Sequence, residues 1–313
     1  MKYENASGLE IGDDGSVRSN YWSFRRSVSR LGNELLQIAI GDFAEGVSLP
    51  EWLHWQQFAV EPPGRETLEV LRQEQTIPSA VNELIDGLQR LSRTFLVFAD
   101  FFLVEPGNLW NGSPDSLAAR QLKWCYPITA HDDEFLKRST LLSTLVLEGL
   151  SAPALRKILS AIDDTLHLSN DVPRKSLGSR NLLQRLTMLA AILDTFQPKI
   201  TEIAELVRTG ERKVALDLLD LRTELDSIHK KVRDDFAPLA FLYDVRTHAG
   251  IAHAPNKKYV QEAAKQLGLP DKNWSRRDYM LLLNMITAAI RRVSDYLWAA
   301  ISPRQRGWPL PHP

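Results

Sequence analysis

Apolar residues recur at intervals of three and four along most of this 313-residue chain, which is the spacing of one face of an α-helix. The clearest stretches lie at residues 84–102, 182–193, 214–232 and 282–297. Alternation of apolar and polar residues, the pattern of a half-buried strand, does not stand out along the sequence. The sequence therefore predicts an all-α protein of about ten helices.

Residues that break helices mark the expected ends of these stretches. Thr209-Gly210 separates two long helices, Pro255-Asn256 precedes a short one, and Ser302-Pro303 closes the last. A polar stretch near residues 170–179, which contains proline and glycine, predicts a boundary between two domains. The predicted organisation is a flexible N-terminus at 1–20, a helical N-terminal domain at 21–172, a C-terminal helical bundle at 176–301 and an extended proline-rich tail at 302–313.

The net charge of −1 conceals an uneven distribution of charge along the chain. Residues 1–150 carry 13 Lys and Arg against 21 Asp and Glu, whereas residues 151–313 carry 25 against 18. The basic excess is concentrated at residues 246–306, with 11 basic residues against four acids. A basic region of this kind indicates a polyanionic partner, although a solvated surface has the same composition.

Targeting and cofactor signals are weak or absent in the sequence. The first 20 residues lack the apolar core of a signal peptide, and the longest apolar stretch, Phe95–Val104, is too short to span a bilayer. The single cysteine, Cys125, excludes a disulfide scaffold and suits a reducing compartment. Phosphate-loop, dinucleotide-binding and zinc-protease motifs are also missing. We therefore expect a cytoplasmic protein without membrane contact, metal or cofactor.

The segment from residue 239 to residue 253 holds the most suggestive group of polar side chains. Its pattern predicts an amphipathic helix that continues to Pro255. On such a helix Arg246 and His253, seven residues apart, project from nearly the same face. Asp244 and His248, four residues apart, are also neighbours. An arginine and two histidines near a helix end can bind an anion and transfer a proton near neutral pH.

This segment resembles the signature of the HEPN superfamily, an arginine followed by four to six residues and then a histidine. Here six residues separate Arg246 from His253, and helices surround the motif as in that family. Family members usually have a polar Asn, Asp or His directly after the arginine, whereas this chain has Thr247. The resemblance covers residues 176–301.

The resemblance implies a metal-independent endoribonuclease that acts as a homodimer, with two Arg/His motifs facing each other in one cleft. In such enzymes the RNA 2′-hydroxyl attacks the neighbouring phosphate and leaves a cyclic phosphate. Arg246 is then expected at the scissile phosphate and His253 at the 2′-hydroxyl, with His248 and Asp244 in support. Proteins of this kind often serve as toxins or antiviral effectors.

The basic residues after the motif are the expected RNA contacts. They are Lys257, Lys258, Arg276, Arg277, Arg291 and Arg292. Tyr259, Trp274 and Tyr279 lie among them and are available to stack on bases, although packing in the core is the favoured interpretation for Trp274. The acidic N-terminal half is interpreted as a regulatory domain that covers this surface or senses a ligand or protein.

Two other functions are consistent with the same residues. The first is a non-catalytic helical interaction module, in which Arg246 only pairs with an acid of its own or another helix. The second is a nucleotide-binding partner of a nucleotidyltransferase, which would use the same basic region. RNA cleavage that depends on Arg246 and His253 would distinguish the nuclease from the interaction module and from the nucleotide-binding partner.

Overall fold

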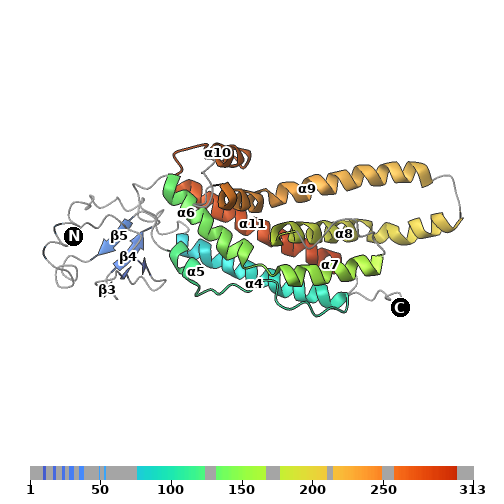
Figure 1. Ribbon diagram of the computed structural model, residues 1–313, viewed down its shortest axis with the longest axis horizontal. Coiled ribbons are helices and arrows are strands. Elements are labelled where there is room, and N and C mark those ends of the chain that lie inside the picture. The colour runs from blue at the N-terminus through green and yellow to red at the C-terminus, as the bar shows by residue number, and fades with distance from the viewer. Residues whose placement is uncertain are drawn as a thin grey trace.

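The computed structural model describes residues 76–123, 132–166, 177–209, 214–248 and 257–301, together with short strands between residues 10 and 38 and the single residues Leu49 and Leu53. The predicted all-α class is confirmed, because helices make up most of the described chain (Figure 1). Their bounds are α4 Ile77–Phe101, α5 Leu117–Leu122, α6 Asp132–Ser143, the π-helix η2 Thr144–Glu148, α7 Ala152–Leu166, α8 Ser179–Thr209, α9 Val214–His248, α10 Lys257–Gln266 and α11 Arg276–Ile301.

Several helices begin where a side chain caps the free backbone amides. At the start of α4 the Thr76 hydroxyl accepts a hydrogen bond from the Ser79 amide at 3.3 Å, and Pro78 lies in the first turn. Just before α11 the Ser275 amide donates to the Asp278 carboxylate at 2.7 Å, which is a capping arrangement across three residues. Local chemistry therefore defines the helix starts that periodicity alone leaves approximate.

Helices α4 and α11 form the most extensive helix–helix contact of the described chain, and they lie side by side (Figure 1). The Thr94 and Ser294 hydroxyls share a buried hydrogen bond of 2.9 Å between them. Helix α8 packs on α7, α9 and α11, while α6 and α10 pack on α9. None of the helices in the described ranges is both long and apolar enough to cross a membrane.

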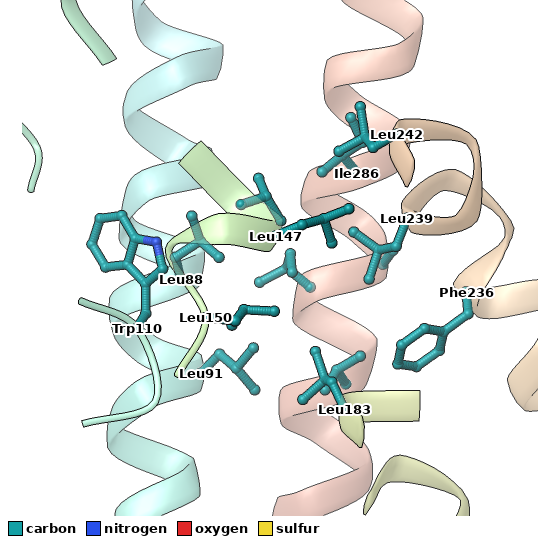
Figure 2. Close-up of a cluster of buried hydrophobic side chains, with 14 of the residues drawn as sticks. Leu88, Leu91, Trp110, Leu147, Leu150, Leu183, Phe236, Leu239, Leu242 and Ile286 are labelled. Carbon is teal, nitrogen blue, oxygen red and sulfur yellow. The ribbon is translucent and has the colours of Figure 1, made fainter. Parts of the chain in front are cut away.

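One hydrophobic core joins both halves of the chain. Figure 2 shows Leu88 of α4 near Leu183 of α8, Leu239 of α9 and Ile286 of α11, and the buried cluster extends from Ile77 to Ile301. The described helices on either side of the predicted boundary between 21–172 and 176–301 therefore share this core. The polar stretch that suggested it interrupts the sequence without dividing the core, and residues 167–176 themselves lie outside the described chain.

Short antiparallel strands lie in the predicted flexible N-terminus, residues 1–20, and in the first part of the region in which helices were expected. Strand β1 (Glu10–Ile11) pairs with β2 (Val17–Arg18), and β2 pairs with β3 (Ser23–Phe24). Strand β4 (Val28–Leu31) pairs with β5 (Leu35–Ile38) in a separate hairpin. Strands this short contain too few residues to display an alternating pattern, which explains why the helical prediction was wrong at residues 23–24, 28–31 and 35–38. The predicted tail at 302–313 lies outside the described residues.

Candidate functional site

Three of the four predicted catalytic residues lie in the last two turns of α9. They are Asp244, Arg246 and His248, and His248 is the final described residue of the helix. The fourth residue, His253, belongs to the stretch 249–256, which lies outside the described chain. The expected alignment of Arg246 and His253 along one helix face therefore stays a prediction.

Arg246 forms an ion pair with a residue that sequence analysis did not connect to it. Its Nη2 atom lies 2.9 Å from Oε1 of Glu148, the last residue of η2. The Arg246 side chain is 48% exposed and the Glu148 side chain 39% exposed. Arg246 thus has an acidic partner on another helix, as the interaction-module interpretation expects, yet its guanidinium remains accessible to solvent.

Asp244 and His248 lie on a different side of α9 from Arg246. Residues two apart differ by about 200° around a helix, whereas residues four apart nearly coincide. Burial raises the pKa of the Asp244 carboxyl, and the positive charges of Arg180 and His248 oppose this shift. The expected proximity of Asp244 and His248 is therefore supported, and the structure adds Arg180 as a further neighbour.

Arg180, in the first turn of α8, is a basic residue of this region that sequence analysis missed. Its guanidinium carbon lies 4.8 Å from the centre of the Tyr243 ring, within the range of a cation–π contact. Its Nε and Nη2 atoms also donate hydrogen bonds to the Asn181 side chain at 3.1 and 2.8 Å. No local pattern links Arg180 to α9, because the two helices meet only through the tertiary fold.

Two tyrosines expose part of their rings near the end of α9. Tyr243 is 45% exposed, and Tyr259 of α10 is 47% exposed. The Tyr259 ring contacts the His248 imidazole, with ring centres 4.3 Å apart and an angle of 46° between the ring planes. This exposure is compatible with the predicted role of Tyr259 in base stacking, and Tyr243 joins it as a second ring.

The other two aromatic residues considered for base stacking are buried. Trp274 lies against Phe135 with ring centres 4.8 Å apart, and its Nε1 donates to the Pro270 carbonyl at 2.6 Å. Tyr279 is fully buried beneath the Arg138 guanidinium. The prediction that Trp274 packs in the core is confirmed, whereas base stacking is wrong for Tyr279, because contacts in the core hold both side chains away from the surface.

The predicted RNA-contacting cations divide into paired and exposed residues. Arg291 lies 3.1 Å from Glu83 of α4, and Arg292 lies 2.6 Å from Asp235 of α9. Both arginines remain about half exposed. Lys258 and Arg277 are exposed and Arg276 is half-buried, while the Lys257 side chain is outside the described part. The fold thus gives Arg291 and Arg292 structural partners and leaves Lys258 and Arg277 at the surface.

The backbone that carries Glu148 is held in place by Trp110. The five-residue π-helix η2 follows α6 directly, and a π-helix frees carbonyls from the regular helical pattern. The Trp110 indole donates to the Leu145 carbonyl at 2.9 Å, and the Asn111 amide donates to the Gly149 carbonyl at 2.9 Å. A side chain at Gly149 would come within 2.5 Å of the Leu145 carbonyl oxygen. Glu148 therefore projects from a closely packed backbone.

Metal-binding side chains do not gather in the part of the chain that the structure describes. Within those ranges no group of three or more His, Cys, Asp or Glu residues is arranged to hold a metal ion. The described side chains around the end of α9 can instead bind an anion through Arg246, while Arg180 and His248 lie near Asp244 on a different side of the helix.

No family model, curated protein or solved structure matches this chain. The functional interpretation therefore depends on the residues at the end of α9 and on their surroundings.

Proposed function

We propose that this protein is a metal-independent endoribonuclease of HEPN type that acts through Arg246 and His253. The observation that supports it best is the position of Arg246 in the last turn of α9, with a half-exposed guanidinium. An arginine that is fixed at a helix end and open to solvent can receive a phosphate. The proposed enzyme is a cytoplasmic homodimer in which the motifs of two chains form one site, and its proposed role is that of a toxin or antiviral effector.

The proposed reaction is an internal transesterification of RNA. The 2′-hydroxyl oxygen attacks the adjacent phosphorus while its proton passes to the imidazole of His253. The bond from phosphorus to the 5′-oxygen then breaks, and this oxygen takes up a proton. Arg246 stabilises the extra negative charge on the phosphorane. The products are a 2′,3′-cyclic phosphate and a 5′-hydroxyl, so neither a metal nor a cofactor enters the balance.

The neighbouring residues support an RNA substrate. Arg180 adds positive charge near α9, and Tyr243 and Tyr259 offer partly exposed rings on which bases can stack. His248 and Asp244 act as supporting residues in this proposal. The His248 charge in turn acts on Asp244, where it opposes the rise in pKa that burial causes.

The test is cleavage of a labelled single-stranded RNA by the full-length protein. Arg246→Ala and His253→Ala are each expected to lower the cleavage rate by at least about a hundredfold, whereas EDTA is expected to have no effect. Arg233→Ala is the matched control, because Arg233 is an exposed arginine of the same helix. Equal activity in all of these proteins, or activity that disappears with EDTA, contradicts the proposal.

The proposed dimer predicts complementation between inactive chains. A mixture of Arg246→Ala and His253→Ala proteins is expected to recover part of the activity, because a mixed dimer brings together one intact arginine and one intact histidine. Light scattering on the same samples measures the oligomeric state. A monomer that cleaves RNA at full rate contradicts the composite site.

A non-catalytic interaction module is the second candidate function, and one observation favours it. Arg246 is paired with Glu148, in the same manner as Arg291 is paired with Glu83 and Arg292 with Asp235. In this case Arg246 only joins two helices. Absence of RNA cleavage, combined with loss of stability in Arg246→Ala, would identify this function.

A further inference from the structure

The ion pair between Arg246 and Glu148 brings an internal anion to the cation that the proposed reaction requires. We propose that the Glu148 carboxylate occupies the phosphate-binding position of Arg246 and that an incoming RNA phosphate must displace it. This inference rests on the proposed function, because it describes how access to that same site is regulated. Glu148 thus becomes a built-in competitor of the substrate.

The carboxylate reaches Arg246 from a backbone that packing holds in place. Hydrogen bonds from Trp110 to the Leu145 carbonyl and from Asn111 to the Gly149 carbonyl secure η2 on both sides of Glu148. The Thr144 hydroxyl also lies 3.5 Å from Oε1 of Glu148, the same oxygen that contacts Arg246. The competing anion is therefore positioned by residues of the acidic first half of the chain.

The same ion pair is weak enough to be displaced. One guanidinium nitrogen contacts one carboxylate oxygen, and both side chains are well exposed. Exposed pairs of this kind contribute little, because water and salt screen the two charges. A phosphate diester offers two oxygens that can engage the guanidinium in a two-pronged contact, which is stronger than a single contact. RNA can therefore replace Glu148 without unfolding the helices that carry the pair.

The arrangement predicts what removal of the charge does. Glu148→Gln preserves the size of the side chain and removes the negative charge that competes with phosphate. Binding of RNA is expected to become about two- to fivefold tighter, which corresponds to the loss of one exposed ion pair. The increase in RNA affinity must depend on Arg246. The double variant Glu148→Gln with Arg246→Ala is therefore expected to bind RNA no more tightly than Arg246→Ala alone.

The experiment measures the binding of a fluorescent 2′-O-methyl RNA of mixed sequence to the full-length protein by anisotropy. This probe lacks the attacking hydroxyl and stays intact, so binding is observed apart from cleavage. Glu83→Gln is the matched control, because it removes the same charge from the Arg291 pair, whose side chains are 54% and 44% exposed. Circular dichroism verifies that each variant is folded.

Three results overturn the inference. The first is an affinity of Glu148→Gln no higher than that of the unmodified protein, including undetectable binding by both. The second is an equal gain in Glu83→Gln, which would indicate a general effect of surface charge. The third is a gain that persists when Arg246 is removed.

Cleavage of the unmodified RNA separates this inference from the proposed function. If no variant cleaves RNA but Glu148→Gln binds it more tightly through Arg246, the proposed nuclease activity is wrong and the proposed competition by Glu148 is supported. If cleavage depends on Arg246 while Glu148→Gln leaves binding unchanged, the proposed nuclease activity is supported and the proposed competition by Glu148 is wrong.

Discussion

Two arginine–glutamate pairs in this protein have nearly the same length and opposite surroundings. Arg138 and Glu134 lie 2.7 Å apart with side chains only 2% and 12% exposed, whereas Arg246 and Glu148 lie 2.9 Å apart with side chains 48% and 39% exposed. The first pair joins successive turns of α6, and the second joins η2 to α9. Because the two pairs have the same chemistry and nearly the same length, the comparison isolates the effect of burial on the role of an ion pair.

Burial makes the Arg138–Glu134 pair a structural contact. Arg138 also donates to the Leu122 carbonyl at 3.2 Å and lies 5.5 Å from the centre of the Tyr279 ring. Removing one partner there leaves a charge in a site that is largely shielded from water. The Arg246 pair can exchange its partner for water or a phosphate, because both groups already face solvent. Exposure, rather than distance, makes Arg246 the better candidate for binding.

The largest expected effect on stability comes from breaking the buried pair. Arg138→Met leaves Glu134 without its main partner and is expected to lower the free energy of unfolding by about 3 to 5 kcal/mol. Urea unfolding measures the change. Lys137→Met is the control, because Lys137 is the next residue and is 61% exposed, and a change within about 0.5 kcal/mol is expected. Equal losses of unfolding free energy in the two variants would show that burial does not make the Arg138 pair more important for stability.

The second prediction concerns alkaline pH and Tyr279. Burial raises the pKa of Tyr279 from 10.0 to about 12, against the opposing charge of Arg138. The unfolded chain therefore ionises first, and the folded state loses about 2 to 3 kcal/mol of stability from this group as the pH rises from 10 to 12. Urea unfolding across this range measures the loss, which Tyr279→Phe is expected to remove. Tyr243→Phe, at a half-exposed ring, is the control.

A third prediction tests the backbone behind the exposed pair. Gly149→Ala places a methyl group against the Leu145 carbonyl and the Trp110 indole, so we expect a loss of about 1 to 3 kcal/mol in unfolding free energy. The matched variant is Gly178→Ala, whose added methyl group has no described atom within 4 Å. If Gly149→Ala is as stable as Gly178→Ala, η2 does not hold Glu148 in the way we infer.

The smallest expected effect on stability belongs to the exposed pair itself. Arg246→Ala and Glu148→Gln are each expected to change the free energy of unfolding by at most about 1 kcal/mol, and a double-mutant cycle is expected to give a coupling of similar size. Thermal and urea unfolding measure both quantities. A coupling of about 3 kcal/mol or more would make Arg246 a structural residue like Arg138 and would favour the interaction module.

The candidate site was partly accessible from the sequence. The spacing of four residues indicated that Asp244 and His248 are neighbours, and the effect of the His248 charge on the pKa of Asp244 supports this. The contacts of Arg246 with Glu148 and of Arg180 with Tyr243 were not accessible, because each joins residues from different helices. The alignment of Arg246 with His253 stays a prediction, since His253 lies outside the described residues.

Local patterns and tertiary packing thus determined different features of this protein. The sequence by itself specified the long helices and many of their ends, because helical periodicity, caps and helix-breaking residues act over a few neighbouring positions. Only the tertiary structure decided that α4 and α11 share one core, that Trp274 and Tyr279 are buried, and that Glu148 faces Arg246. These features depend on which helix faces meet, and that choice minimises exposed apolar area over the whole chain.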